Sequence, residues 1–145
     1  MVHMQVHTNV EPSADVAMNT MEAVRLNNMA LQLSNSGDNV SAEALHHQAL
    51  ALKERAHGPK SIQAALTLNA LGEVQSCQGK FEEAEVNLRR AVAIRNSAGN
   101  TFDAAVSREN LAQVFEAKGK FSEAKEMRDY GRPDKISCGN GSVSL

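Results

Sequence analysis

The sequence repeats itself three times, and this repetition constrains the fold more than any other feature. When Gly37, Gly79 and Gly119 are aligned, the neighbouring segments match at offsets of 42 and 40 residues. The clearest match follows the second and third glycines, where Gly-Lys-Phe-Glu-Glu-Ala corresponds to Gly-Lys-Phe-Ser-Glu-Ala. Self-similarity at such a period is the mark of a solenoid, in which each unit packs only against its neighbours.

Each unit has the pattern of two helices joined by a turn. In the middle unit, Leu68, Leu71 and Val74 recur at helical spacing, and Gly79 is placed to end that helix in a left-handed conformation. The whole pattern predicts helices near 14–35, 39–56, 61–77, 81–96, 102–117 and 121–130. Small residues recur where paired helices should cross most closely, namely Ala30, Gly72 and Ala112 in the first helices and Ala42, Ala84 and Ala124 in the second.

The predicted fold is all-α, a right-handed superhelical solenoid of three antiparallel helical hairpins. We expect this domain to span 14–131, with repeats at about 23–57, 65–98 and 105–131. Residues 1–13 and 132–145 are predicted to be flexible. Aromatic residues make up only 3% of the chain, which favours helices over a β-sandwich or barrel.

Composition argues against several classes of function. A formal net charge of −2 is too close to neutral for a nucleic-acid binder. The chain has no apolar run of about eighteen residues that could span a membrane. The polar N-terminus lacks the apolar stretch of a signal peptide, so we expect a cytoplasmic protein whose two cysteines, Cys77 and Cys138, are reduced.

No catalytic or metal site is predicted, and we expect neither enzymatic activity nor a cofactor. None of the five histidines has a nucleophile or a carboxylate at a spacing that indicates a catalytic pair. His46 and His47 are adjacent in a helix and point about 100° apart, so they cannot chelate one ion together. Met1-Val2-His3 is a poor copper or nickel motif. Cys138 resembles the start of a zinc finger, but no Cys or His follows it in this chain.

The repeats resemble the tetratricopeptide repeat, in the longer variety found in kinesin light chains. The middle copy carries the resemblance in Ala64-Ala-Leu-Thr-Leu-Asn-Ala-Leu-Gly, Gly79-Lys-Phe-Glu-Glu-Ala-Glu and Arg89-Arg-Ala-Val-Ala-Ile-Arg. The likeness covers roughly 22–130. The first copy departs from it, with Asn39 in place of Phe and His46 in place of Leu. The resemblance implies a scaffold that binds other proteins, without implying which ones.

In that family the first helices of the repeats line a concave groove that holds an extended peptide. Asparagine suits this task because its amide both donates and accepts hydrogen bonds. Carried onto this chain, the resemblance implies a groove formed mainly by Asn27, Asn28, Leu31, Asn69, Glu73, Glu109, Asn110 and Gln113. Further lining would come from Val24, Asn35, Leu66, Ser76, Val106 and Glu116.

The charge of these residues suggests what the partner is like. None of the first-helix positions that would clamp an acidic C-terminal tail is basic, whereas Glu73, Glu109 and Glu116 are acidic. A neutral or basic protein or peptide is therefore the expected partner. The alternative is a self-associating module, in which the end faces of the stack pair between chains as a homodimer.

Overall fold

The computed structural model describes residues 13–130, and the regular secondary structure of that range is entirely helical. The six helices are α1 (Ala14–Asn35), α2 (Asn39–His57), α3 (Ile62–Cys77), α4 (Phe81–Ser97), α5 (Thr101–Ala117) and α6 (Phe121–Asp129). Their ends agree with the sequence prediction to within one residue. The segments 1–12 and 131–145, predicted to be flexible, lie outside the described residues.

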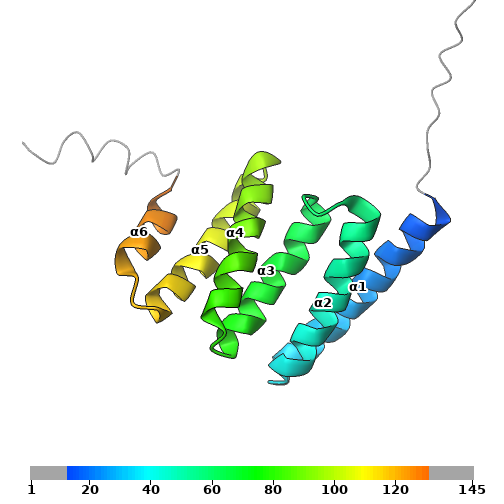
Figure 1. The fold of residues 1–145 in the computed structure, drawn as a ribbon, viewed down its shortest axis with the longest axis horizontal. Helices are drawn as coiled ribbons and strands as arrows, with labels where there is room; N and C mark the ends of the chain where they lie inside the picture. The colour runs from blue at the N-terminus through cyan, green and yellow to red at the C-terminus, as the bar shows by residue number, and fades with distance from the viewer. Residues whose placement is uncertain (1–12, 131–145) are drawn as a thin grey trace, which may run out of the picture.

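The helices stand side by side in chain order, with α1 and α6 at opposite ends of the row (Figure 1). Each helix packs against the next one along the chain, so three antiparallel hairpins form, α1–α2, α3–α4 and α5–α6. The first helices α3 and α5 also contact each other directly. This is the predicted all-helical solenoid.

Local sequence signals explain where the helices begin and end. The side chains of Ser13, Asp38 and Ser61 each accept a hydrogen bond from a backbone N–H in the first turn of α1, α2 and α3. The predicted left-handed turn is present at Gly79, whose φ is +78°. A side chain would be strained there, so glycine permits the tight reversal between α3 and α4.

The small residues lie at the helix crossings, as predicted. Ala30, Ala42, Ala84, Ala112 and Ala124 are all buried in the core. Gly72 is the tightest case, because a Cβ atom at this position would lie 2.3 Å from Leu88 Cγ of α4. Helices α3 and α4 can approach this closely only because Gly72 has no side chain.

The core runs continuously from one hairpin into the next. Val74 of α3 packs with Ala30 and Ala42 of the first hairpin, and Phe115 of α5 packs with Leu88 and Ala84 of the second. Because each interface joins two repeats, the position of one hairpin determines the position of the first helix of the next. The first helices α1, α3 and α5 are therefore held at fixed places in the row.

Candidate peptide-binding groove

Apolar side chains are exposed at the same position of all three first helices. Val24 of α1 is 47% exposed, Leu66 of α3 is 56% exposed and Val106 of α5 is 39% exposed. These residues are related by the same offsets of 42 and 40 that relate the glycines. A single exposed apolar residue is ordinary, but three at equivalent positions form a row across the stack.

A pocket lies at the N-terminal end of this row, where α1, α2 and α3 meet. Its volume is ≈ 120 Å³, which is small beside the roughly 300–1,000 Å³ of typical small-molecule sites. It can hold a side chain but not a cofactor. The pocket is lined by Val24, Asn27, Asn28, Leu31, His46, Lys53, Leu66 and Ala70.

Three of the predicted groove residues, Asn27, Asn28 and Leu31, therefore lie together in one pocket. Asn28 and Leu31 are exposed, and Asn28 makes no hydrogen bond to another described side chain. Of the further predicted residues, Val24 and Leu66 line the same pocket.

Asn27 differs from the prediction, because it is buried and its amide is used inside the protein. Asn27 Nδ2 donates to Thr67 Oγ1 of α3 at 2.9 Å. Asn27 Oδ1 accepts from His46 Nδ1 of α2, also at 2.9 Å. The residue joins three helices, and both ends of its amide are already hydrogen-bonded.

Asn69, which is also predicted to line the groove, occupies the equivalent position of the second repeat and is only 8% exposed, so most of its side chain is buried. Its Oδ1 accepts from Ser107 Oγ of α5 at 2.8 Å and from Asn110 Nδ2 at 3.2 Å. Its Nδ2 donates to Glu73 at 3.2 Å. The amide of Asn110 also donates to Glu73, at 2.8 Å. These polar groups form a network between α3 and α5.

The predicted acidic end of the groove is largely neutralised. Arg128 of α6 donates two hydrogen bonds to Glu109, at 3.0 and 3.1 Å, and a further one to Glu116. The hydrogen bond from Arg128 lowers the pKa of Glu116 and keeps it charged. Gln113 is exposed and donates to Glu109 at 3.4 Å. An acidic surface that attracts basic ligands is therefore weaker than the sequence indicates, because α6 supplies the counter-charge.

Three residues of the pocket were not predicted as groove residues, namely His46, Lys53 and Ala70. His46 and Lys53 were missed because they come from the second helix α2. A sequence signal for them existed. His46 replaces Leu88 of the middle repeat, and Lys53 corresponds to Arg95 at the same offset of 42. A basic residue at this otherwise apolar face of the second helix is the feature that could have identified them.

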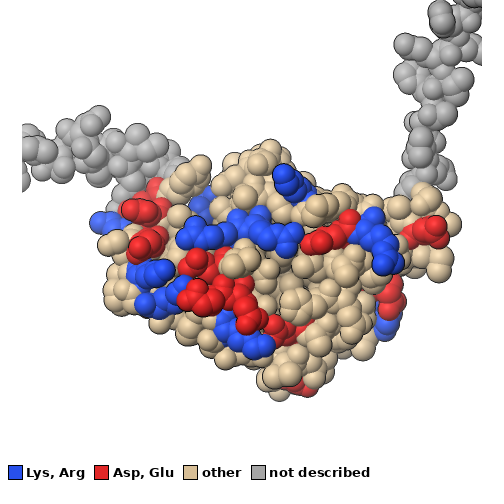
Figure 2. Space-filling model, viewed as in Figure 1, with Lys and Arg blue, Asp and Glu red and all other residues tan. Residues whose placement is uncertain are grey.

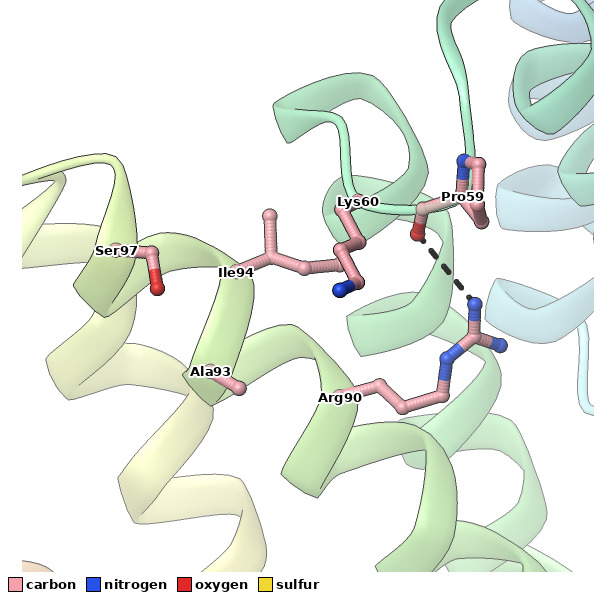
Figure 3. A pocket seen from close by; sticks show the side chains of 6 residues that line it. All are labelled: Pro59, Lys60, Arg90, Ala93, Ile94 and Ser97. Atoms are coloured by element: carbon pink, nitrogen blue, oxygen red, sulfur yellow. Dashed lines mark hydrogen bonds between the residues drawn. The ribbon is translucent and has the colours of Figure 1, made fainter.

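A larger cleft of ≈ 350 Å³ lies elsewhere, between the α2–α3 loop and α4 (Figure 3). Pro59 and Lys60 line it from the loop, and Arg90, Ala93, Ile94 and Ser97 line it from α4. Arg90 Nη2 donates to the carbonyl oxygen of Pro59 at 3.5 Å. The first helices α1, α3 and α5 do not contribute to it, so it is separate from the predicted groove.

The charged side chains of both signs are interspersed over the face seen in Figure 2, where acidic groups gather near the centre with basic groups around them. Within residues 13–130, no three His, Cys, Asp or Glu side chains are arranged to hold a metal ion. Cys77 lies exposed at the end of α3 as a free thiol. None of the helices in this range is both long enough and apolar enough to cross a membrane.

The fold and the row of first helices define a helical-repeat scaffold. A family model of the tetratricopeptide repeat matches residues 21–97, more than half of the sequence, and the chain belongs to this family. Tetratricopeptide repeats in general are non-catalytic scaffolds that mediate interactions between proteins. No curated protein sequence matches closely enough to count as a relative.

Among solved structures, the chain is similar to BtubC (BKLC) from P. vanneervenii, with 27% identity and a TM-score of 0.72. The alignment covers 85% of this chain and 50% of BtubC, so the chain spans about half the length of that structure. This neighbour fits the resemblance of the repeats to those of kinesin light chains.

Proposed function

We propose that the chain binds an extended peptide segment of a partner protein in the groove formed by α1, α3 and α5, and that it acts by binding rather than by catalysis. The observation that carries the proposal is the row of exposed apolar side chains Val24, Leu66 and Val106. An extended peptide offers side chains at regular intervals, and a repeat protein offers matching sites at regular intervals.

The pocket beside Val24 and Leu66 supports the same proposal. It presents apolar surface together with Asn28, whose exposed amide can pair with a peptide backbone. The buried amides of Asn27 and Asn69 act indirectly, since they hold neighbouring first helices in place and so determine the distance between sites.

The experiment is a binding measurement with a random library of short synthetic peptides and the full chain. Leu66→Gln should lose most peptide binding, because it removes the central apolar side chain of the row. The substitution should not unfold the protein, since Leu66 is exposed on α3. Val86→Gln is the matched control, since Val86 is 59% exposed but lies on the second helix α4. Equal loss in both variants, or none in Leu66→Gln, would contradict a groove on the first helices.

The second candidate function is self-association through the outer face of α1. Met18 and Met21 are 68% and 73% exposed there and line a shallow surface depression with Asn19, Glu22 and Arg25. Size-exclusion chromatography with light scattering separates the candidates. A stable dimer at low micromolar concentration that Met21→Glu dissociates would favour self-association, and a monomer would favour the peptide groove.

A further inference from the structure

The cleft between the α2–α3 loop and α4 shares no lining residue with the pocket of the proposed groove. Its volume of ≈ 350 Å³ falls within the roughly 300–1,000 Å³ of typical ligand sites. Pro59, Ala93 and Ile94 give its wall an apolar surface, and Lys60 and Arg90 add two basic groups. None of the described residues that line it is acidic.

The loop side of this cleft is held in one conformation. Ser61 Oγ donates to the carbonyl oxygen of Gly58 at 2.8 Å, and the N–H of Gly58 donates to the carbonyl oxygen of Glu54, also at 2.8 Å. The ring of Pro59 restricts the backbone between them. Arg90 then joins the loop to α4 through the carbonyl oxygen of Pro59. A partner that enters the cleft meets walls that need little further ordering.

Arg90 is fixed in place and still has donors to offer. Its Nη2 donates to Glu54 Oε1 at 3.1 Å as well as to the Pro59 carbonyl, and Glu54 thereby compensates its charge. Both contacts use Nη2. The N–H groups on Nε and Nη1 have no hydrogen-bond partner among the described residues, so they can donate to an acceptor in the cleft.

Lys60 supplies a positive charge that is not compensated within residues 13–130, where no carboxylate lies within ion-pair distance of it. Its side chain points into the space between Ile94 and the guanidinium of Arg90 (Figure 3). An exposed lysine is ordinary by itself. This one lies beside an apolar wall and across from spare N–H groups, and that combination suits an acidic group attached to an apolar one.

The next junction between repeats shows that the fold does not require these basic residues. At the offset of 40, Asn100 corresponds to Lys60 and Tyr130 corresponds to Arg90. Asn100 is satisfied locally, because its Nδ2 donates to Asp103 Oδ2 at 2.7 Å. The helices pack in the same order at both junctions. The two basic side chains are therefore a property of this cleft and not of the repeat.

We propose that this cleft binds a segment of a partner protein in which a glutamate or aspartate stands beside a large apolar residue. Lys60 and Arg90 donate hydrogen bonds to the carboxylate, and the apolar side chain covers Ala93 and Ile94. The charges are complementary, since the cleft has an uncompensated cation and no acidic lining residue.

A protein segment fits this cleft better than a free small molecule does. Four of its six lining residues are exposed, namely Pro59, Lys60, Ala93 and Ser97. A small ligand would keep much of its surface in water there, whereas small-molecule sites usually enclose most of the ligand. The cleft is independent of the groove on α1, α3 and α5, so the chain can hold two segments at once.

The test uses two short synthetic peptides, acetyl-Gly-Leu-Glu-Gly-amide and its counterpart with Gln in place of Glu. Blocked ends exclude recognition of a terminal carboxylate. Binding is followed by nuclear magnetic resonance of the isotope-labelled full chain, through the backbone amides of Lys60, Ala93 and Ser97. The Glu peptide should shift these signals saturably, with an affinity about tenfold higher than that of the Gln peptide. The amides of Leu66 and Val106 report on the groove separately.

Two variants remove the site without touching the core. Lys60→Gln removes the uncompensated charge, and Ala93→Glu places a carboxylate of the chain itself in the cleft. Both positions are exposed, so the fold should be kept, and each variant should weaken binding of the Glu peptide about tenfold. Lys120→Gln is the matched control, because it removes an exposed lysine from the α5–α6 loop. Leu66→Gln, which alters the groove, should leave the cleft signals unchanged.

The outcomes are distinct from those of the groove experiment. A preference for the Glu peptide that is lost in Lys60→Gln and Ala93→Glu and kept in Lys120→Gln supports the site. The site is overturned if the cleft amides show no saturable shift, if both peptides bind equally, or if the two cleft variants bind as the wild type does. The groove function stands in each of these cases.

Two further measurements test the choice of occupant. Sodium hexanoate carries a carboxylate on an apolar chain but is no peptide, and tighter binding of hexanoate than of the Glu peptide would overturn a protein segment in favour of a small amphipathic acid. Shifts of the same amides when the protein alone is concentrated would overturn it in favour of a second copy of the chain. Spectra that do not change with protein concentration, and weaker binding of hexanoate, support the segment.

Discussion

Asn27 Nδ2 donates a hydrogen bond of 2.9 Å to Thr67 Oγ1, and this bond joins the first helix of one repeat to the first helix of the next. The same pair of positions meets again one repeat later, where Ser107 Oγ donates to Asn69 Oδ1 at 2.8 Å. The donor and the acceptor are exchanged between the two sites. In the first repeat, Asn27 Oδ1 accepts a hydrogen bond from His46 instead. In the second repeat, Arg95 donates a hydrogen bond to Ser107 Oγ, and the hydroxyl of Ser107 donates to Asn69.

Asn27→Ala should destabilise the fold, because it leaves His46 Nδ1 and Thr67 Oγ1 buried without their partner. We expect a loss of about 1–3 kcal/mol in the free energy of unfolding, measured by urea denaturation. Asn28→Ala, one residue along the same helix, is the control. Asn28 is exposed and alanine is the better helix former, so its stability should be unchanged or slightly higher. Equal effects at both positions would contradict the difference in burial.

Ala84→Leu should overpack the core where α4 meets α5 and α6. Ala84 is fully buried in the cluster that contains Leu88 and Phe115, so three extra carbon atoms must displace well-packed neighbours. A cost of about 1–3 kcal/mol is expected in a denaturant melt. Ala93→Leu on the same helix is exposed and should change the stability by less than about 0.5 kcal/mol. A neutral Ala84→Leu would mean that α4 packs in another register.

His46 should make the protein less stable in mild acid. Burial, Lys53 and His47 lower its pKa from 6.5 to about 4 in the folded chain. Between these values the unfolded chain binds a proton that the folded chain does not, so stability falls as the pH decreases from 6.5 to 4. The slope should be about 1.4 kcal/mol per pH unit from this residue.

The measurement is the unfolding free energy across that pH range in the wild type and in His46→Leu, which copies the middle repeat. The variant should show a shallower dependence. His47→Gln is the comparison, because His47 is the smallest of the three influences on the pKa of His46, so this variant should reduce the pH dependence by less than His46→Leu does. An unchanged slope in His46→Leu would show that another group is responsible.

Arg128→Gln should make the C-terminal end of the groove more acidic. Arg128 pairs with Glu109 and Glu116, and these contacts are partly exposed, so the variant should lose no more than about 1 kcal/mol of stability. Peptides with a central Lys should bind the variant more tightly than the wild type at low salt, and added salt should reduce the gain. Arg25→Gln, which removes an exposed ion pair on α1, should not produce this gain.

The helices and their order could be predicted from the sequence, because the signals for them are local. The helical spacing of apolar residues and the left-handed glycine at Gly79 act within a few residues of themselves, and the repetition presents the same signals again at offsets of 42 and 40. The small residues at the crossings followed from the same register. The row of Val24, Leu66 and Val106 was also accessible, since equivalent positions of a repeat face the same way.

The roles of individual polar side chains were decided by the tertiary structure. Asn27 and Asn28 are the same residue type at adjacent positions, yet packing of α2 and α3 buries one amide and leaves the other exposed. The acidity of the groove depended on Arg128, which reaches Glu109 from another helix. Lys53 became part of the pocket because α2 packs between α1 and α3. Burial and pairing depend on residues some twenty to forty positions away, and no local pattern encodes which of them meet.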